Sequence, residues 1–116
     1  RVIEKNLQTC GFEERGVAVC SRAEAIYDNP ETVLKRFQKR GFDLLTITPP
    51  YEEVDYGALL SRVVKSKDLL ADGAIVAIEY PTELGSLPPV LGNRLIGMRN
   101  RKYGRTMLAV YCLNPG

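Results

Sequence analysis

The stretch Phe42–Tyr51, FDLLTITPPY, decides how the rest of the chain can be placed. Its apolar residues alternate with threonines, a β-branched mixture that is typical of a buried central strand. The strand must end at Thr48, because neither Pro49 nor Pro50 can donate a backbone hydrogen bond to a sheet. Ligands of open α/β sheets bind at the carboxyl ends of the strands, so we predict that Thr48 and Tyr51 border a binding site. A strand that ends in a plain proline turn is the alternative.

Strand and helix patterns alternate on both sides of this stretch. In chain order the predicted elements are a helix over 1–10, a strand over 16–20, a loop over 21–26, a helix over 30–40 that buries Val33, Leu34 and Phe37, the strand over 42–48, a helix over 56–68, a turn over 69–73, a strand over 74–79, a surface loop over 80–93, and a hairpin with strands over 95–99 and 106–112. This order predicts one α/β domain over 1–116, with a mostly parallel sheet that ends in an antiparallel hairpin.

The composition limits the chemistry that the protein can perform. The 116 residues include three dispersed cysteines and no histidine. Triads that need imidazole are therefore excluded, and we expect no metal site. The cysteines are expected to be reduced thiols of an intracellular protein. No apolar run reaches the roughly 18 residues that cross a bilayer, so we expect no membrane partner.

Basic residues gather near the end of the chain. Residues 1–84 hold all 14 acids against 11 bases, a net charge of −3, whereas residues 85–116 hold five bases and no acid. Within that tail lie Arg99, Arg101, Lys102 and Arg105. Such a patch favours a polyanion and would bind it less tightly as salt rises, which makes these residues candidate RNA contacts. A solvated basic hairpin is the alternative.

Three motifs together resemble the later half of bacterial-type methyltransferases that modify the exocyclic amine of a guanine in small-subunit ribosomal RNA. The motifs are TPPY at 48–51, ADG at 71–73 and KYGRT at 102–106. In that family a strand ends in Asp or Asn, two prolines and Tyr or Phe, and Lys-Tyr-Gly-x-Thr joins the last two strands. The resemblance covers nearly the whole chain and implies a partial Rossmann-like fold of the class I S-adenosylmethionine-dependent methyltransferases.

The resemblance assigns the base to the TPPY segment. By this analogy Tyr51 stacks on an extruded guanine, the carbonyl of Pro49 accepts a hydrogen bond from the amine, and Pro50 stiffens the exit from the strand. Thr48 departs from the family pattern. Because a hydroxyl carries neither a charge nor a planar acceptor, we expect weaker activity or a different substrate.

The cofactor side of the site is a second departure from the pattern. The family's glycine-rich turn for S-adenosylmethionine is not in this sequence, which opens in what would be the helix after the second strand. The loop that contacts the adenine corresponds to Arg22, Ala23 and Glu24, with Arg22 at the usual Asp or Asn position and Glu24 as a substitute. We therefore expect the chain alone to be inactive and to bind the cofactor weakly or not at all. Low-micromolar binding in a calorimetric titration would contradict this.

Three functions remain open from the sequence. The first is the catalytic portion of an rRNA guanine methyltransferase, in the bacterial cytoplasm or in a chloroplast or mitochondrion. The second is a non-catalytic RNA-binding or ribosome-assembly module, and the third is a stable fragment without activity. The strand order of the family also leaves one edge of 42–48 unpaired. Unpaired edges seek partners, so we expect that edge to pair with 16–20 or with a second copy of the chain.

Overall fold

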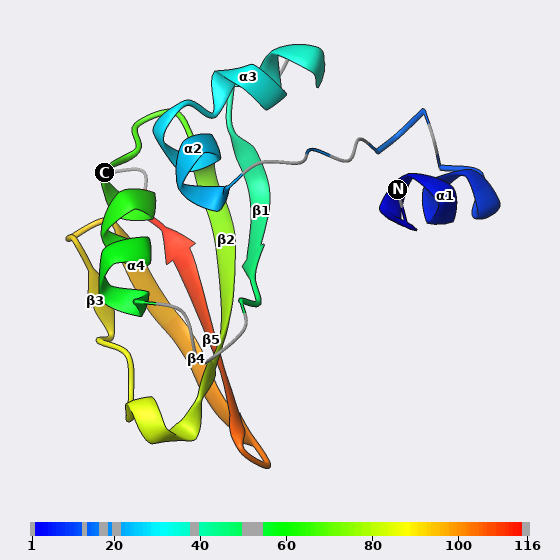
Figure 1. Ribbon diagram of the computed structural model, residues 1–116. Coiled ribbons are helices and arrows are strands. Elements are labelled where there is room, and N and C mark those ends of the chain that lie inside the picture. The colour runs from blue at the N-terminus through cyan, green and yellow to red at the C-terminus, as the bar shows by residue number, and fades with distance from the viewer. Residues whose placement is uncertain are drawn as a thin grey trace.

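The computed structural model describes residues 2–12, 14–16, 19, 22–37, 40–49 and 55–114. Five strands in these residues form one sheet in the order β1-β2-β5-β4-β3 (Figure 1). The elements in chain order are α1 (Val2–Thr9), α2 (Ala23–Asp28), α3 (Glu31–Leu34) with a 3₁₀ turn (Lys35–Phe37), β1 (Phe42–Ile47), α4 (Tyr56–Lys65), β2 (Leu70–Pro81), a 3₁₀ turn (Thr82–Leu84), β3 (Val90–Leu91), β4 (Leu95–Tyr103) and β5 (Thr106–Leu113). This order confirms the predicted α/β class and the terminal hairpin.

The sheet contains one parallel pair, β1 with β2, among the described residues. The pairs of β2 with β5, β5 with β4 and β4 with β3 are antiparallel. The prediction of a mostly parallel sheet is therefore wrong for this part of the chain. Parallel pairing needs a crossover, which α4 provides between β1 and β2, whereas β3, β4 and β5 are joined by short turns that reverse the chain. The predicted strand over 16–20 falls largely outside the described residues.

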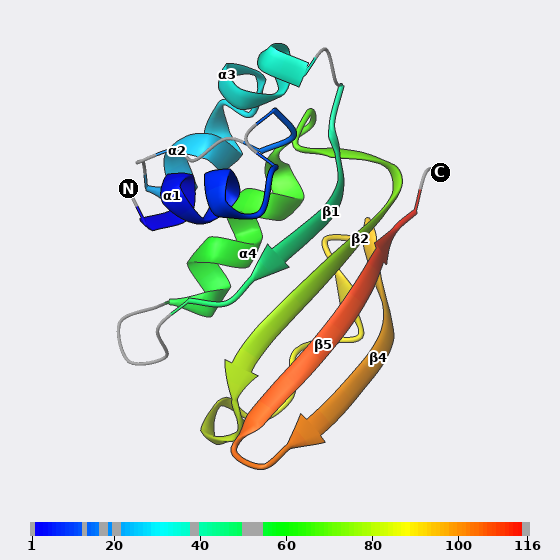
Figure 2. The same ribbon diagram turned by 90° about the vertical axis from the view of Figure 1, so that its right-hand side faces the viewer.

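The hydrophobic core lies between the sheet and α4. In β2, Val76, Ile78 and Tyr80 are fully buried, and the residues between them are half-buried. Figure 2 shows the opposite side of the sheet, where β2, β5 and β4 have no helix of the described chain in front of them. We call this side the open face and define it by Ala77 and Glu79 of β2 and by the residues paired with them.

β1 forms an edge of the sheet instead of the buried centre that its apolar residues predicted. It pairs only with β2 in the described chain, and Leu44 is 60% exposed. This matches the bare edge that the family's strand order implied. No pairing of that edge with Gly16 or Val19, the described residues of the predicted strand, is seen. Pairing with a second copy stays a prediction.

The structure corrects two predictions near the start of the chain, a loop over 21–26 and the length of the helix over 30–40. Ala23–Asp28 forms α2, although the sequence predicted a loop over 21–26. Tertiary contacts explain this helix, because Tyr27 is buried in the core and Asp28 pairs with Arg62 of α4 at 2.6 Å. The helix predicted over 30–40 is shorter, and its Phe37 is 43% exposed instead of buried.

The strands after α4 are longer than predicted. β2 begins at Leu70 and takes in the predicted turn, where Gly73 has a positive φ of 75°. The predicted surface loop over 80–93 contains the short strand β3 and begins with the fully buried Tyr80. β4 and β5 are joined by a two-residue turn in which Gly104 has a φ of 62°, a conformation that glycine adopts without a steric cost.

Candidate functional site

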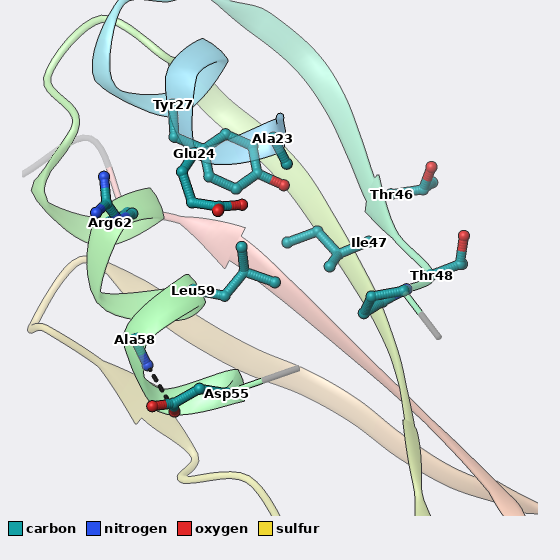
Figure 3. A pocket seen from close by; sticks show the side chains of 11 residues that line it. Ala23, Glu24, Tyr27, Thr46, Ile47, Thr48, Asp55, Ala58, Leu59 and Arg62 are labelled. Atoms are coloured by element: carbon teal, nitrogen blue, oxygen red, sulfur yellow. Dashed lines mark hydrogen bonds between the residues drawn. The ribbon is translucent and has the colours of Figure 1, made fainter. Parts of the chain in front are cut away.

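A hollow of about 540 Å³ opens at the carboxyl end of β1, between α2 and α4 (Figure 3). We call it the β1 hollow. Its lining residues are Ala23, Glu24, Tyr27, Thr46, Ile47, Thr48, Pro49, Asp55, Ala58, Leu59 and Arg62. The structure thus brings two predicted groups together: Ala23 and Glu24 from the expected cofactor loop, and Thr48 and Pro49 from the TPPY segment. Pro50 and Tyr51 lie outside the described residues.

Apolar and polar side chains both line the β1 hollow. Ile47 and Leu59 are buried side chains that point toward each other across it (Figure 3). Glu24 and Arg62 add charges of opposite sign to this lining. Apolar walls with a few polar groups are typical of small-molecule sites. This combination suits the flat ring and the polar edge of a nucleoside.

Asp55 fixes the start of α4 beside the hollow. Its carboxylate accepts a hydrogen bond from the backbone N–H of Ala58 at 3.1 Å, as drawn in Figure 3. An aspartate at this position satisfies one of the helix's unpaired N–H groups and interacts favourably with the helix dipole. Asp55 is therefore the N-cap of α4.

Tyr27 and Glu24 form the polar part of the hollow's α2 wall. Burial raises the pKa of the Tyr27 phenol above its ordinary value of 10, and the negative charge of Glu24 raises it further. The phenol therefore remains protonated at neutral pH and can donate a hydrogen bond. Both side chains come from α2, which the sequence did not predict.

Replacing Tyr27 by phenylalanine is expected to reduce the loss of stability in alkaline solution. Because the pKa of Tyr27 is raised in the folded state, its neutral phenol adds to the free energy of unfolding. This contribution is fully present below pH 10 and is lost as the pH rises through the folded-state pKa. The melting temperature of the wild type should therefore fall more steeply above pH 10 than that of Tyr27→Phe. Tyr103→Phe, at a tyrosine that is 56% exposed, is the matched control. Equal slopes for all three proteins would contradict the assignment.

Thr48 borders the hollow, but its side chain turns away from it. Figure 3 shows the hydroxyls of Thr46 and Thr48 on the side of β1 opposite to Ile47, which points into the hollow toward Leu59. This is the alternation expected for successive residues of an extended chain. Thr48 is exposed and not sealed in the interior, as the predicted site requires.

Arg22 stays outside the β1 hollow. Its side chain is 89% exposed, and its Nε lies 3.8 Å from a carboxylate oxygen of Glu24. Of the three residues predicted to contact the cofactor, Ala23 and Glu24 line the hollow and Arg22 does not.

The predicted RNA contacts divide between two sides of the hairpin. Arg99 pairs with Val110 and Arg101 with Leu108, and both pairs belong to the open face. Lys102 pairs with Met107, which lies opposite Tyr80 on the core side. Arg105 is in the turn, and all four cations are exposed. The hairpin therefore presents positive charge in more than one direction.

Tyr27, Leu59 and Arg62 are lining residues that the sequence did not single out as site residues. The helical spacing of Ala23, Ile26 and Tyr27 is a signal that could have identified α2. No sequence signal identifies Arg62, because its partner Asp28 is 34 residues away. Within the described ranges no three metal-ligating side chains come together, and none of the helices there is long and apolar enough to span a bilayer.

Comparisons with known proteins agree with this architecture. Residues 1–112 match the family model described as "Conserved hypothetical protein 95". The chain is 32% identical over 109 residues to the "Putative rRNA methyltransferase YlbH" of Bacillus subtilis, a match that covers 92% of this chain and 58% of the relative. The chain thus spans little more than half of that protein.

Two solved structures share the fold. A conserved hypothetical protein of Streptococcus pyogenes has a TM-score of 0.77 at 23% identity, over 97% of this chain and 64% of that one. The "Putative methyltransferase yhhF from Escherichia coli" has a TM-score of 0.71 at 19% identity, over 98% of this chain and 57% of that one. These likenesses confirm the predicted partial Rossmann-like fold.

Proposed function

The chain belongs to the family described as conserved hypothetical protein 95, and from this premise we propose that it is the base-binding portion of an rRNA methyltransferase. The proposed reaction transfers a methyl group from S-adenosylmethionine to the exocyclic amine of a guanine in small-subunit ribosomal RNA. The observation that carries the proposal is the β1 hollow, in which Ala23 and Glu24 meet Thr48 and Pro49. The name of the Bacillus subtilis relative, a putative rRNA methyltransferase, supports the methylation of ribosomal RNA.

The residues of the β1 hollow fit the nucleoside end of S-adenosylmethionine. Ile47 and Leu59 offer apolar surfaces for the adenine ring, and the Glu24 carboxylate can accept hydrogen bonds from its amine. When bound, the cofactor supplies a methyl group on a positively charged sulfur. The glycine-rich turn that holds the rest of this cofactor in related enzymes is not part of the sequence. This chain would therefore supply only part of the cofactor site.

The TPPY segment would orient the guanine amine. That amine is a poor nucleophile, because its lone pair is delocalised into the ring. Acceptors at the end of β1, the Pro49 carbonyl and the Thr48 hydroxyl, would bind its hydrogens and direct the lone pair toward the methyl group. The stacking of Tyr51 on the extruded base remains part of this proposal.

The basic hairpin would hold the RNA backbone. Arg99, Arg101, Lys102 and Arg105 are exposed cations without an acidic residue in the same segment of the sequence. Their charge would attract small-subunit ribosomal RNA as the partner, in the bacterial cytoplasm or in an organelle that contains ribosomes. The same hairpin favours the second candidate, an RNA-binding or ribosome-assembly module that does not methylate.

The test uses the protein expressed from the open reading frame that contains this chain. Transfer of labelled methyl groups to small-subunit ribosomal RNA, with the label on a guanine amine, is the expected result, and large-subunit RNA is the control. RNA binding without any transfer would favour the non-catalytic module. The absence of both binding and transfer would leave only the inactive fragment.

A further inference from the structure

The strand register aligns Glu79 and Arg101 across the open face, next to the exit of β1. Glu79 of β2 pairs with Leu108 of β5, and Leu108 pairs with Arg101 of β4. At the other side of β2, Ile47 of β1 pairs with Ile78. One further step along both strands brings Thr48 to the level of Glu79. Since neighbouring strands lie about 4.8 Å apart, Glu79 is the nearest carboxylate in this row to the exit of β1.

The side chains of Glu79 and Thr48 lie on the same side of the sheet. Ile78 and Tyr80 are fully buried on the core side, so Glu79 between them points to the open face, where it is half-buried. The Thr48 hydroxyl turns away from the β1 hollow to that same side (Figure 3). Thr46 pairs with Ala77 of the open face. Side chains two residues apart in an extended chain lie on the same face, so Thr48 also belongs to the open face.

The backbone of Glu79 is tied to the segment that follows the prolines. β1 ends at Ile47, so the carbonyl of Glu79 lies beyond the ladder of hydrogen bonds between β1 and β2. The hydroxyl of Tyr56, the first residue of α4, donates to that carbonyl at 3.0 Å. Tyr56 is itself buried. Glu79 is therefore held in a fixed position relative to the exit of β1 and the start of α4.

A carboxylate at this position matches the edge of guanine and of no other common base. Guanine presents two adjacent donors, its ring N1–H and its exocyclic N2–H, and an ionised carboxylate has two acceptor oxygens. Two parallel charge-assisted hydrogen bonds can form, which are stronger than bonds between neutral groups. Adenine and cytosine place a ring-nitrogen acceptor beside their amine, and that acceptor would face the carboxylate. In this arrangement Glu79 accepts the N1–H and one N2–H in place of the Thr48 hydroxyl, and the Pro49 carbonyl accepts the second N2–H.

We propose that Glu79 is the specificity residue that reads guanine, and that it supplies the charged acceptor that Thr48 lacks. The proposal rests on the proposed function for the choice of a guanine amine as substrate. Arg101 lies two strands from Glu79 on the same face, with the backbones about 10 Å apart by the strand spacing, where its guanidinium would bind a phosphate of the RNA. The open face thus divides into a base-reading part and a phosphate-binding part.

The test compares binding of two short RNAs that differ in one base, guanine or 2-aminopurine. Both bases carry the exocyclic amine, but only guanine has the N1–H. With the protein expressed from the open reading frame that contains this chain, the dissociation constants should favour guanine. Glu79→Gln is expected to reduce this preference by about 10- to 100-fold, the value of one hydrogen bond to a charged group. Glu79→Asp, which keeps the carboxylate but withdraws it by one methylene, should give an intermediate preference.

Glu83→Gln is the matched control, because Glu83 is an exposed carboxylate only four residues further along. It should leave the preference unchanged. A merely structural role of Glu79 would weaken the binding of both RNAs equally, and an unchanged ratio in Glu79→Gln and Glu79→Asp would overturn the proposal. Because the readout is binding, it is independent of methyl transfer. A lost preference without any methylation would refute the proposed function and not the role of Glu79.

Discussion

Replacing Gly41 by alanine is expected to lower the free energy of unfolding by about 3 kcal/mol, at the upper end of the usual cost of overpacking. Gly41 is buried immediately before β1, where the chain crosses the start of β2. A Cβ atom there would lie 2.5 Å from the backbone nitrogen of Ala71 and 2.6 Å from the carbonyl carbon of Leu70. Backbone atoms cannot rotate away as a flexible side chain can. One strand must therefore move, and the only parallel pair among the described strands would be disturbed.

Urea unfolding followed by circular dichroism measures this effect, with Gly73→Ala as the control. Gly73 has a positive φ of 75°, but a Cβ atom there would have no other atom within 4 Å, so alanine meets backbone strain and no clash. Its expected cost is about 1 kcal/mol. A loss for Gly41→Ala no larger than that for Gly73→Ala would show that β1 and β2 can separate at this point without a penalty.

Arg99, Arg101 and Lys102 can be changed together to alanine. The resulting loss of RNA affinity is expected to be about 100 times larger at 0.1 M salt than at 1 M salt. Each cation that neutralises a phosphate contributes about 0.7 to the slope of log affinity against log salt for a single strand. Three such contacts give a slope change of about 2, which corresponds to that factor over a tenfold range of salt. Fluorescence anisotropy of a labelled ribosomal RNA fragment at several salt concentrations measures both the affinity and the slope.

A matched control removes the same charge elsewhere on the molecule. Lys35, Arg36 and Arg40 are exposed cations around the 3₁₀ turn that follows α3, far from the hairpin in Figure 1. Their replacement by alanine should leave the salt slope nearly unchanged. Equal losses for the two triple variants would mean that net charge alone attracts the RNA. Lys102→Ala by itself tests the core side of the hairpin, because Arg99 and Arg101 remain on the open face.

Much of the candidate site was predictable because its elements depend on local chemistry. Prolines without an N–H end β1 after Ile47, and the glycine at 104 permits the tight turn of the hairpin. The helix predicted over 56–68 is α4, whose apolar spacing carries the buried residues Tyr56, Leu59, Leu60 and Val63. The family resemblance added the TPPY segment and the cofactor loop, and Thr48 and Glu24 do border one hollow.

The parts that could not be predicted depend on contacts between distant residues. α2 forms where Tyr27 enters the core and Asp28 meets Arg62, which is 34 residues away. The position of β1 at the sheet edge follows from the order of all strands and not from its own apolar residues.

The sequence by itself determined where the chain leaves β1, which segments form the terminal hairpin, and that positive charge gathers there. Proline geometry, glycine turns and the spacing of charged residues act within a few positions, so they can be read without a fold. Only the tertiary structure decided that Glu24 and Thr48 border the same hollow and that Glu79, Leu108 and Arg101 share one row. Strand register sets these relations, since a shift of one residue would turn each side chain to the other face of the sheet.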